Sequence, residues 1–365
     1  MRILIPILGF AKSGGFRVLS QFANYWSKSG HEVSFLCSSN SINPYFPTEA
    51  KIIWFNDKNE IVNTNKFEKK KPLNVFIKQI ALYKVLSKYA NEYDIVLANH
   101  SLTALPVNMA KIKAKKFYYV QAFEPDYYVS RKTLIGKFLY HYSNYTYKLK
   151  NLDIIVNAPV YYSYKSIEAN KYVPCGLDLE VYYPKNINAI NFEKETIKIG
   201  AIGRVESFKG TTFVIEAFTK IKQNKLFNKK MELYLAFADI KTENHESSIF
   251  VLTPKSDLEL ADFYRSMDII IAPAIGQFGA IHYPVIESMA CCTPIITTYF
   301  MPAHEGNAWL VSPQNSDSII SQIESIISNS KIVKEKAYHA LYDIQQFNWS
   351  IIANKMISYF TAKES

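Results

Sequence analysis

The stretch that decides the fold is Ile199–Gly210, IGAIGRVESFKG. A short apolar run ends in Gly203, Arg204 follows directly, and Lys209 comes five residues after Arg204. The next residues, Thr211–Gln223, carry apolar side chains with a helical period. We therefore predict a strand, a tight basic loop and a helix. Such a loop is suited to binding a phosphate at the helix N-terminus, although an ordinary βα loop with two solvated cations is the alternative.

A second loop of the same kind follows about seventy residues later along the chain. Ile269–Ala272 is predicted as a buried strand, and residues 273–283 form a loop that contains two glycines. Pro284 then opens a predicted helix that contains Glu287, since proline is favoured in the first turn. Two such loops in one chain indicate a ligand site more strongly than either loop does alone.

The two segments together resemble the nucleotide-sugar half of glycosyltransferase family 4, the retaining enzymes of GT-B fold. The matching residues are GRVESFKGTTFVIEAF at 203–218 and YPVIESMACCTPIITT at 283–298. The wider resemblance covers residues 1–37, 94–128, 172–184 and 197–312. It is weak over 41–92 and 129–165, where such enzymes usually set acceptor specificity.

The resemblance implies an α/β protein with two Rossmann-like, doubly wound parallel-sheet domains that face a cleft. We expect an acceptor-side domain over 1–185 and a nucleotide-sugar domain over 186–345. The C-terminal helix, within residues 346–365, is expected to cross back onto the first domain. The segment Tyr172–Pro184 resembles the crossing between the domains, with Cys175 where the family more usually has Asn.

Length and composition agree with a two-domain intracellular enzyme. The chain has 365 residues, of which 48% are hydrophobic and 20% charged, so it can build two cores. The start MRILIPILGF is predicted as a buried strand rather than a signal peptide, and no run of about 18 apolar residues occurs. The four cysteines lack CxxC spacing, which favours a reducing cytoplasm without a disulfide frame or a zinc site.

The net charge of +10 admits three kinds of partner. Nucleic acid is disfavoured, because the sequence has no such binding motif and no basic tail. A phosphate-rich substrate and an anionic membrane surface remain, and a biased source composition is the neutral alternative. The predicted helix Asn74–Tyr89 could lie on a membrane, but Lys84 and Lys88 share a face while Lys78 sits about 120° away. A solvated helix face is therefore favoured there.

The first half of the chain begins with a βαβ unit. Arg2–Leu8 and His31–Cys37 are predicted strands, and Phe16–Ser29 is the helix between them. The glycines before this helix do not form GxGxxG, and the second strand is not followed by an acid, which excludes an NAD-type site. By resemblance, Gly14 and Gly15 lie near the donor phosphates and the acceptor; a tight turn is the alternative.

Two further candidates follow predicted strands in this half. His100 comes after the strand Tyr93–Ala98, and Glu124 after the strand Lys116–Val120. By resemblance, His100 faces the donor sugar and Glu124 belongs to the acceptor side, where open α/β sheets bind ligands. A structural histidine and an exposed acidic turn over packed aromatics are the respective alternatives.

The chemistry implied by the resemblance is sugar transfer, in which a diphosphate leaves. Arg204 can bind two phosphate oxygens and Lys209 supplies a point charge, so no metal and no cofactor are expected. Glu287, placed in the first turn of its helix, resembles the acid that binds the ribose hydroxyls; a favourable charge at a helix N-terminus is the alternative. Further donor-side candidates by resemblance are Gly203, Thr253, Lys255, His282 and Tyr283.

One departure from the family concerns the donor sugar. Family members often have a second Glu eight residues before the ribose acid, but here that position is Gly279, and the usual GFG run is altered to Ala280-Ile281-His282. Gln277 or His282 could take over, or the donor could be a deoxysugar. We expect a cytoplasmic transferase, peripheral at the inner face of a membrane, that moves a sugar from a nucleotide sugar to a glycan or lipid-linked acceptor in cell-surface polysaccharide synthesis. A weak or inactive nucleotide-binding protein and a sugar-nucleotide epimerase are the rivals.

Overall fold

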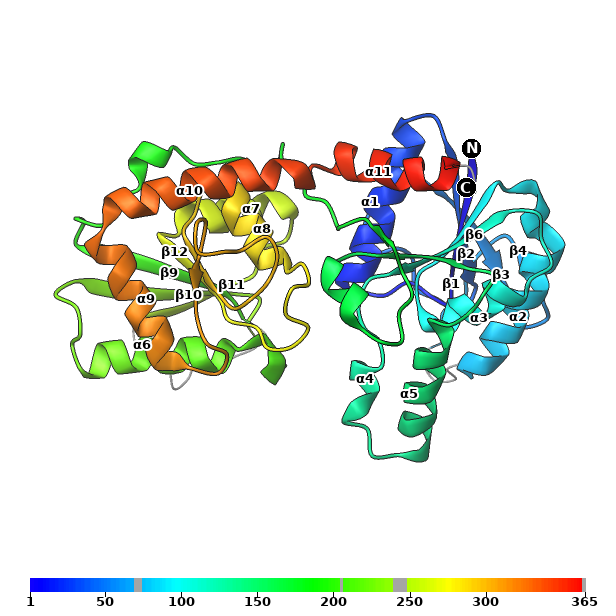
Figure 1. Cartoon of the computed structure of the whole chain (residues 1–365), viewed down its shortest axis with the longest axis horizontal. Helices are drawn as coiled ribbons and strands as arrows, with labels where there is room; N and C mark the ends of the chain where they lie inside the picture. Colours follow the sequence, from blue (N-terminus) through cyan, green and yellow to red (C-terminus); the bar gives the residue numbers. More distant parts are fainter. Residues whose placement is uncertain (69–73, 204–205, 239–247, 363–365) are drawn as a thin grey trace. The chain divides into compact units, whose positions relative to one another are not determined.

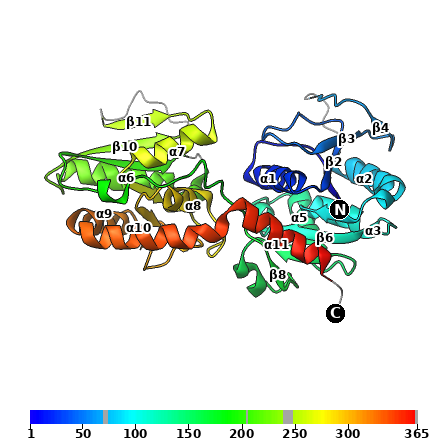
Figure 2. The same ribbon diagram turned by 90° about the horizontal axis from the view of Figure 1, so that it is seen from above.

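The computed structural model describes residues 1–68, 74–203, 206–238 and 248–362. By their internal contacts these residues divide into two compact units (Figures 1 and 2). Unit 1 is Met1–Gly176 together with Trp349–Ser365, and unit 2 is Leu177–Asn348. Each unit is built on one sheet of its own.

Unit 1 is built on a nearly all-parallel sheet with the strand order β4-β3-β2-β1-β5-β6-β7-β8. Its central strands are short apolar runs that are buried on both faces, as expected for a parallel sheet covered by helices. Only the β3–β4 pair is antiparallel among the described strand pairs. The strands are β1 (Arg2–Ile7), β2 (Glu32–Ser38), β3 (Lys51–Phe55), β4 (Ile61–Val62), β5 (Ile95–Ala98), β6 (Lys115–Val120), β7 (Asp153–Val156) and β8 (Lys171–Tyr172).

Helices cover this sheet in two groups. The helix α1 (Gly14–Lys28) packs against α11 (Trp349–Thr361), whereas α2 (Val75–Tyr89), α3 (Ser101–Met109) and α5 (Leu134–Thr146) pack against one another. The short α4 (Asp126–Val129) follows β6 and forms a hairpin with α5 that projects from the sheet (Figure 1).

The last helix belongs to the first unit, as the sequence predicted. The Trp26 indole N–H of α1 donates to the Ala353 carbonyl oxygen of α11 over 3.1 Å, and the Trp349 ring stacks edge-on against Phe22. Gly176 allows this close packing, because a Cβ there would lie 2.5 Å from the Trp349 ring. The predicted return of the C-terminal helix is confirmed.

Unit 2 has an all-parallel sheet among its described strands, in the order β11-β10-β9-β12-β13-β14. The first strand of the unit, β9, lies in the middle, paired with β10 on one side and β12 on the other. The strands are β9 (Thr196–Ile202), β10 (Lys230–Ala236), β11 (Ile249–Leu252), β12 (Ile269–Ala272), β13 (Ile295–Thr297) and β14 (Trp309–Leu310).

Helices of unit 2 also form two groups that pack on its core. The helix α6 (Thr211–Gln223) packs on α9 (Ser316–Ser328), and α7 (Asp257–Ser266) packs on α8 (Tyr283–Ala290). The long α10 (Ser330–Ile344) contacts both α8 and α9. Two doubly wound parallel sheets with a returning C-terminal helix are the architecture that the sequence predicted.

Two local differences from the sequence expectations have clear causes. No strand is predicted from the sequence within residues 41–71, but β3 and β4 extend the sheet edge there; both strands are too short to show a reliable pattern. The sequence set the domain limits at 185/186 and 345/346, whereas the contacts divide the chain after Gly176 and before Trp349. The crossing segment joins unit 2 because the Leu177 N–H donates to the Phe347 oxygen over 2.7 Å.

Candidate functional site

The two loops singled out in the sequence meet in unit 2. They follow β9 and β12, which are adjacent parallel strands, so both emerge at the carboxyl edge of the sheet. The Ile275 N–H donates to the Phe208 carbonyl oxygen over 2.7 Å. Gly210 has a φ of +76°, and a Cβ at this position would collide with the carbonyl oxygen of Pro273. The loops therefore touch backbone to backbone, which the sequence analysis did not foresee for Gly210.

The cations of the first loop can be placed in part. Lys209 ends the short 3-10 turn η4 (Ser207–Lys209), and its ammonium lies 5.2 Å from the Phe208 ring centroid. Its charge reaches the second loop, where it contributes to a lowered pKa of His282. Arg204 lies outside the described residues, so its role as a phosphate ligand stays a prediction from sequence.

Gly203 has a structural reason to be glycine. Its N–H donates to the Ala236 carbonyl oxygen over 2.7 Å, and a Cβ at this position would lie 2.5 Å from the Ala238 Cβ. The close approach is therefore to the neighbouring strand end. A ligand contact at Gly203 stays a prediction.

His282 stands out in the second loop, directly before α8. Its ring centroid lies 4.9 Å from that of Phe300, and its Nδ1 is buried without a hydrogen-bond partner among the described residues. The residue as a whole keeps some solvent exposure, so it is the Nδ1 side that is enclosed. Burial, and then the charge of Lys209, lowers the pKa of His282 to about 3. The imidazole is therefore neutral at physiological pH and can still donate or accept one hydrogen bond.

The loop before His282 explains the missing acid. Gly276, Gln277 and Gly279 have φ values of +92°, +47° and +84°, all in the left-handed region. The Gly279 N–H donates to the Tyr299 oxygen over 2.6 Å, which fixes this path. A residue with a side chain rarely adopts a φ as large as that of Gly279, so the backbone favours glycine where the family often has glutamate.

Glu287 lies deeper in its helix than predicted. The helix α8 begins at Tyr283 with Pro284 as its second residue, so Glu287 is in the second turn, not the first. Its side chain is buried, and Oε2 accepts a 2.8 Å hydrogen bond from the Tyr264 hydroxyl. Burial and the Glu287 charge raise the pKa of Tyr264. Tyr264 thus holds this carboxylate in place, while ribose binding by Glu287 stays a prediction, as does the donor role of Tyr283.

The proposed base contacts follow β11. Thr253 and Lys255 are both exposed, and Ser256 caps the next helix, α7. The Lys255 N–H donates to the Glu259 carboxylate over 2.8 Å. A backbone contact from Lys255 to a base would therefore use its carbonyl oxygen, and the predicted role of the pair stays a prediction.

In unit 1, Gly14 and Gly15 are the first two residues of α1, not part of the preceding loop. Neither has a left-handed φ, so the tight-turn alternative does not describe them. A Cβ at Gly14 would meet nothing within 4 Å, and one at Gly15 would touch the Gln121 side chain at 3.4 Å. Both backbone N–H groups belong to a helix N-terminus, a position that suits an anion.

His100 and Glu124 lie together. His100 caps α3 by accepting the Leu102 N–H at Nδ1 over 3.1 Å, and its Nδ1 lies 3.2 Å from Oε2 of Glu124. The two side chains are therefore in direct contact at the N-terminus of α3.

Glu124 is buried, with 4% of its surface exposed, so the exposed acidic turn considered from sequence is wrong. Its carboxylate accepts hydrogen bonds from the Ser101 N–H at 2.9 Å, the Ser101 hydroxyl at 2.5 Å and the Tyr118 hydroxyl at 3.1 Å. These donors hold it against the N-terminus of α3, a favourable place for a negative charge. Glu124 therefore positions α3 and its cap, and direct contact with an acceptor stays a prediction.

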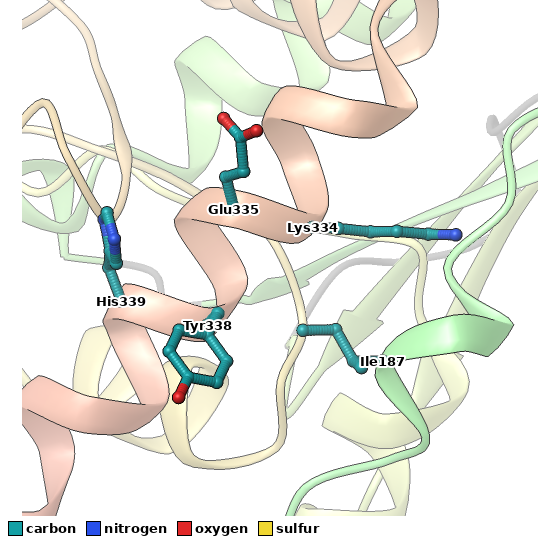
Figure 3. Close-up of a pocket in the computed structure, with 5 residues that line it drawn as sticks. All are labelled: Ile187, Lys334, Glu335, Tyr338 and His339. Carbon is teal, nitrogen blue, oxygen red and sulfur yellow. The ribbon is translucent and has the colours of Figure 1, made fainter.

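An open hollow of about 390 Å³ lies elsewhere on unit 2, between α10 and the 3-10 turn η3 (Ile187–Ala189) (Figure 3). It is lined by Ile187, Lys334, Glu335, Tyr338 and His339. Glu335 and His339 point away from Ile187 (Figure 3). These five side chains do not converge on one point, and none was predicted as a site residue.

Comparison with solved structures identifies the architecture. Sucrose-phosphate synthase from Thermosynechococcus elongatus is 15% identical and covers 99% of this chain and 98% of its own, with a TM-score of 0.73. HepE from Anabaena, in complex with UDP-glucose, is 15% identical over 99% of both chains, with a TM-score of 0.69. WaaG, a glycosyltransferase of lipopolysaccharide biosynthesis, is 13% identical over 99% of this chain and 100% of its own, with a TM-score of 0.66. The fold is GT-B.

Sequence comparison finds a similarity to glycosyltransferases over part of the chain. Residues 196–329, most of unit 2, match the family model described as Glycosyl transferases group 1. An uncharacterised glycosyltransferase of Methanocaldococcus jannaschii is 25% identical over 154 residues, which is 40% of this chain and 43% of that protein. The match thus spans less than half of that relative. Residues 196–329 are therefore similar to the group 1 glycosyltransferases.

Proposed function

We propose that this GT-B protein is a glycosyltransferase that moves a sugar from a nucleotide-diphosphate sugar to a glycan or lipid-linked acceptor. The observation that carries the proposal is the junction of the two loops in unit 2. It brings the cation of Lys209 close to the neutral His282 at the carboxyl edge of a parallel sheet. Nucleotides bind at this edge in open α/β sheets, and the family match covers this unit.

The first loop would stabilise the leaving diphosphate. As the sugar departs, negative charge grows on the phosphate oxygens, and fixed cations stabilise that charge. Lys209 supplies one cation, and Arg204 a second that can bind two oxygens. Each charge-assisted hydrogen bond contributes about 1.5–3 kcal/mol, so no metal is needed in this scheme. Transfer with retention of configuration follows from the resemblance to family 4.

The second loop would read the donor sugar. In place of the family's glutamate it offers glycine in a left-handed conformation, and then the enclosed Nδ1 of His282. A neutral imidazole can make one hydrogen bond to a sugar hydroxyl, whereas a carboxylate can bind two. We infer a donor that needs fewer hydroxyl contacts than a common hexose, such as a deoxysugar.

The setting of the reaction is proposed in the same way. The resemblance to bacterial polysaccharide enzymes favours cell-surface glycan synthesis in the cytoplasm, with peripheral contact to an anionic membrane. Among the described residues, no helix has the length and apolar character needed to cross a bilayer. No cofactor and no nucleic acid partner are proposed.

A second candidate is a weak or inactive nucleotide-binding protein of the same fold. The specific observation that favours it is Gly279, whose left-handed backbone conformation disfavours the usual sugar-binding acid. Such a protein would keep the nucleotide pocket but would not turn over.

Ligand-observed NMR with a panel of nucleotide diphosphates and nucleotide sugars would test the proposal. Each sample would then be followed for slow donor hydrolysis, which is transfer to water. The matched pair of variants is Lys209→Ala and Lys225→Ala, the latter an exposed lysine of the same unit. Binding and hydrolysis that fall only in Lys209→Ala support the transferase, and binding without turnover, even with acceptors, supports the inactive binder. No binding by any nucleotide would refute both.

A further inference from the structure

The corner between α4 and α5 presents apolar side chains to solvent. We define the α4–α5 tip as residues 129–138. Within it, Leu134 is 84% exposed, Ile135 69% and Val129 67%, and the Phe138 ring is also exposed. Isolated exposed apolar residues are ordinary, but four within ten residues on one projecting hairpin form a patch. A patch of this kind is suited to contact with an apolar partner.

The shape of the tip is fixed by local contacts. The Thr133 side chain caps α5 by accepting the Gly136 N–H over 3.1 Å. A Cβ at Gly136 would lie 2.5 Å from the Arg131 Cβ and the Arg131 carbonyl oxygen, so the corner closes tightly on this glycine. Leu134 and Ile135 are consequently held outward at the first turn of α5.

The charged residues within the tip are all basic, and Asp126 at the start of α4 is the nearest acid before it in the sequence. Residues 127–152 contain Arg131, Lys132, Lys137, Lys148 and Lys150 but no Asp or Glu. The first three lie within the tip itself, and their side chains are exposed beside the apolar patch. Apolar side chains that alternate with cations match the interface of an anionic bilayer, where the apolar groups enter and the cations meet headgroups.

The apolar surface continues onto α2. The Phe76 ring centroid lies 5.7 Å from that of Phe138, and Phe76, Ile77 and Ile80 are all exposed. The helix α2 also has no acidic residue. Lys78 is not part of its solvated face, because its ammonium donates to the Leu8 and Asn40 carbonyl oxygens at the sheet edge.

The tip stands at the end of unit 1 that carries its candidate residues. Lys78 ties the start of α2 to the segments that follow β1 and β2, which is the carboxyl edge of the sheet. Gly14, His100 and Glu124 come after strands at this same edge. A bilayer that meets the tip would thus lie at the edge where an acceptor is expected.

We propose that the α4–α5 tip, together with the exposed first turns of α2, docks this protein on an anionic lipid bilayer. Leu134 and Ile135 enter the interface, and Arg131, Lys132 and Lys137 bind the headgroup phosphates. The inference deepens the proposed function, because it names the surface through which a lipid-linked acceptor would be reached.

Vesicle flotation of the full chain would test this surface. Vesicles of phosphatidylcholine alone would be compared with vesicles of equal phosphatidylcholine and phosphatidylglycerol. We expect binding only to the anionic vesicles. The triple variant R131Q/K132Q/K137Q should weaken it by on the order of a hundredfold. L134S/I135S should weaken it by at least about tenfold, through lost apolar burial.

Matched controls distinguish binding through the tip from an effect of net charge and from nonspecific hydrophobic adsorption. The variant K58Q/K111Q/K113Q removes the same three charges from exposed sites away from the tip, and M109S/I351S removes exposed apolar side chains elsewhere in unit 1. Both should bind as the parent does. Thermal melting of every variant would confirm folding.

Several results would overturn the proposal. Equal weakening by R131Q/K132Q/K137Q and K58Q/K111Q/K113Q would mean that net charge alone drives binding. No binding of the parent to any vesicle would refute the membrane as the partner. The parent could instead sediment as a dimer and bind no lipid, while L134S/I135S is a monomer. That result would mean that the patch binds a second copy of the chain. Nucleotide binding in solution is measured separately, so failure here leaves the proposed transfer chemistry intact.

Discussion

Two polar clusters occupy equivalent places in the two units, at the carboxyl edges of parallel sheets, yet they are built in opposite ways. In unit 1 the buried carboxylate of Glu124 accepts hydrogen bonds from Ser101 and Tyr118, and His100 caps a helix. In unit 2 the backbone is left-handed at Gly279, and the Nδ1 of His282 has no partner among the described residues.

The difference separates scaffold from chemistry. A buried polar group that is fully hydrogen-bonded stabilises the fold and has little left to offer a ligand. A left-handed loop and an unmatched buried nitrogen cost stability, and such features persist mainly where function requires them. Substitution of Glu124 should therefore change mainly stability, and substitution of Lys209 should change mainly binding.

The largest effect is expected for Glu124→Ala. It would leave the Ser101 N–H and the Tyr118 hydroxyl buried without their acceptor, and should lower the free energy of unfolding by about 3 kcal/mol. Urea denaturation would measure the loss, with the exposed Glu49→Ala as the control, expected within about 0.5 kcal/mol of the parent. Equal stability of the two variants would contradict a positioning role for Glu124.

The next effect concerns Lys209→Ala in unit 2. Loss of one charge-assisted contact to a diphosphate should weaken nucleotide binding or turnover by about tenfold to a few hundredfold. The free energy of unfolding should stay close to that of the parent, unlike in Glu124→Ala. Titration calorimetry with the nucleotide identified by NMR would measure it, beside Lys225→Ala. Unchanged affinity would show that the first loop does not bind phosphate.

A smaller effect is expected for Gly279→Ala. The left-handed φ of +84° becomes strained with a Cβ, at a cost of about 1–2 kcal/mol of stability. Gly14→Ala is the matched control, since its Cβ meets nothing within 4 Å and its φ is ordinary. Thermal melting compares them. Gly279→Glu should carry the same strain and fail to raise turnover, and a faster enzyme with Glu there would refute this account.

The last effect is a change in pH dependence for His282→Asn. The folded state lowers the pKa of His282 to about 3 from an ordinary 6.5, so folding favours the neutral form. This stability is fully present above pH 6.5 and is lost as the pH falls towards 3. Between pH 6.5 and 4, the free energy of unfolding of the parent should therefore fall more steeply with pH than that of His282→Asn. The difference in slope should correspond to at most one bound proton. Denaturation at several pH values would show it.

The control for the pH experiment is His141→Asn, which removes an exposed imidazole of unit 1. This variant should follow the parent curve. Parallel curves for His282→Asn and the parent would mean that the Nδ1 of His282 is not enclosed in solution.

The sequence by itself determined two strand–loop–helix segments in unit 2, and the residues of these segments resemble a family of GT-B fold. Each segment has an apolar run of four to seven residues, then a loop with glycine, and then a helical period. This local pattern predicts a strand, a loop and a helix. That local pattern was enough to place Lys209 and His282 in loops and to find the chain's resemblance to a family.

Only the tertiary structure decided how those residues are used. Gly210 is a glycine because a Cβ there would collide with Pro273, and the left-handed Gly279 is held by a hydrogen bond to Tyr299. Both partners are distant in sequence. Glu124 is buried rather than exposed because its carboxylate accepts hydrogen bonds from Ser101 and Tyr118, which belong to other elements. The exposure of the α4–α5 tip likewise depends on how the other segments of the unit pack, because none of the described segments covers it. The periodicity of apolar residues can be seen in the sequence alone. Burial and backbone conformation depend on contacts between segments that are distant in sequence.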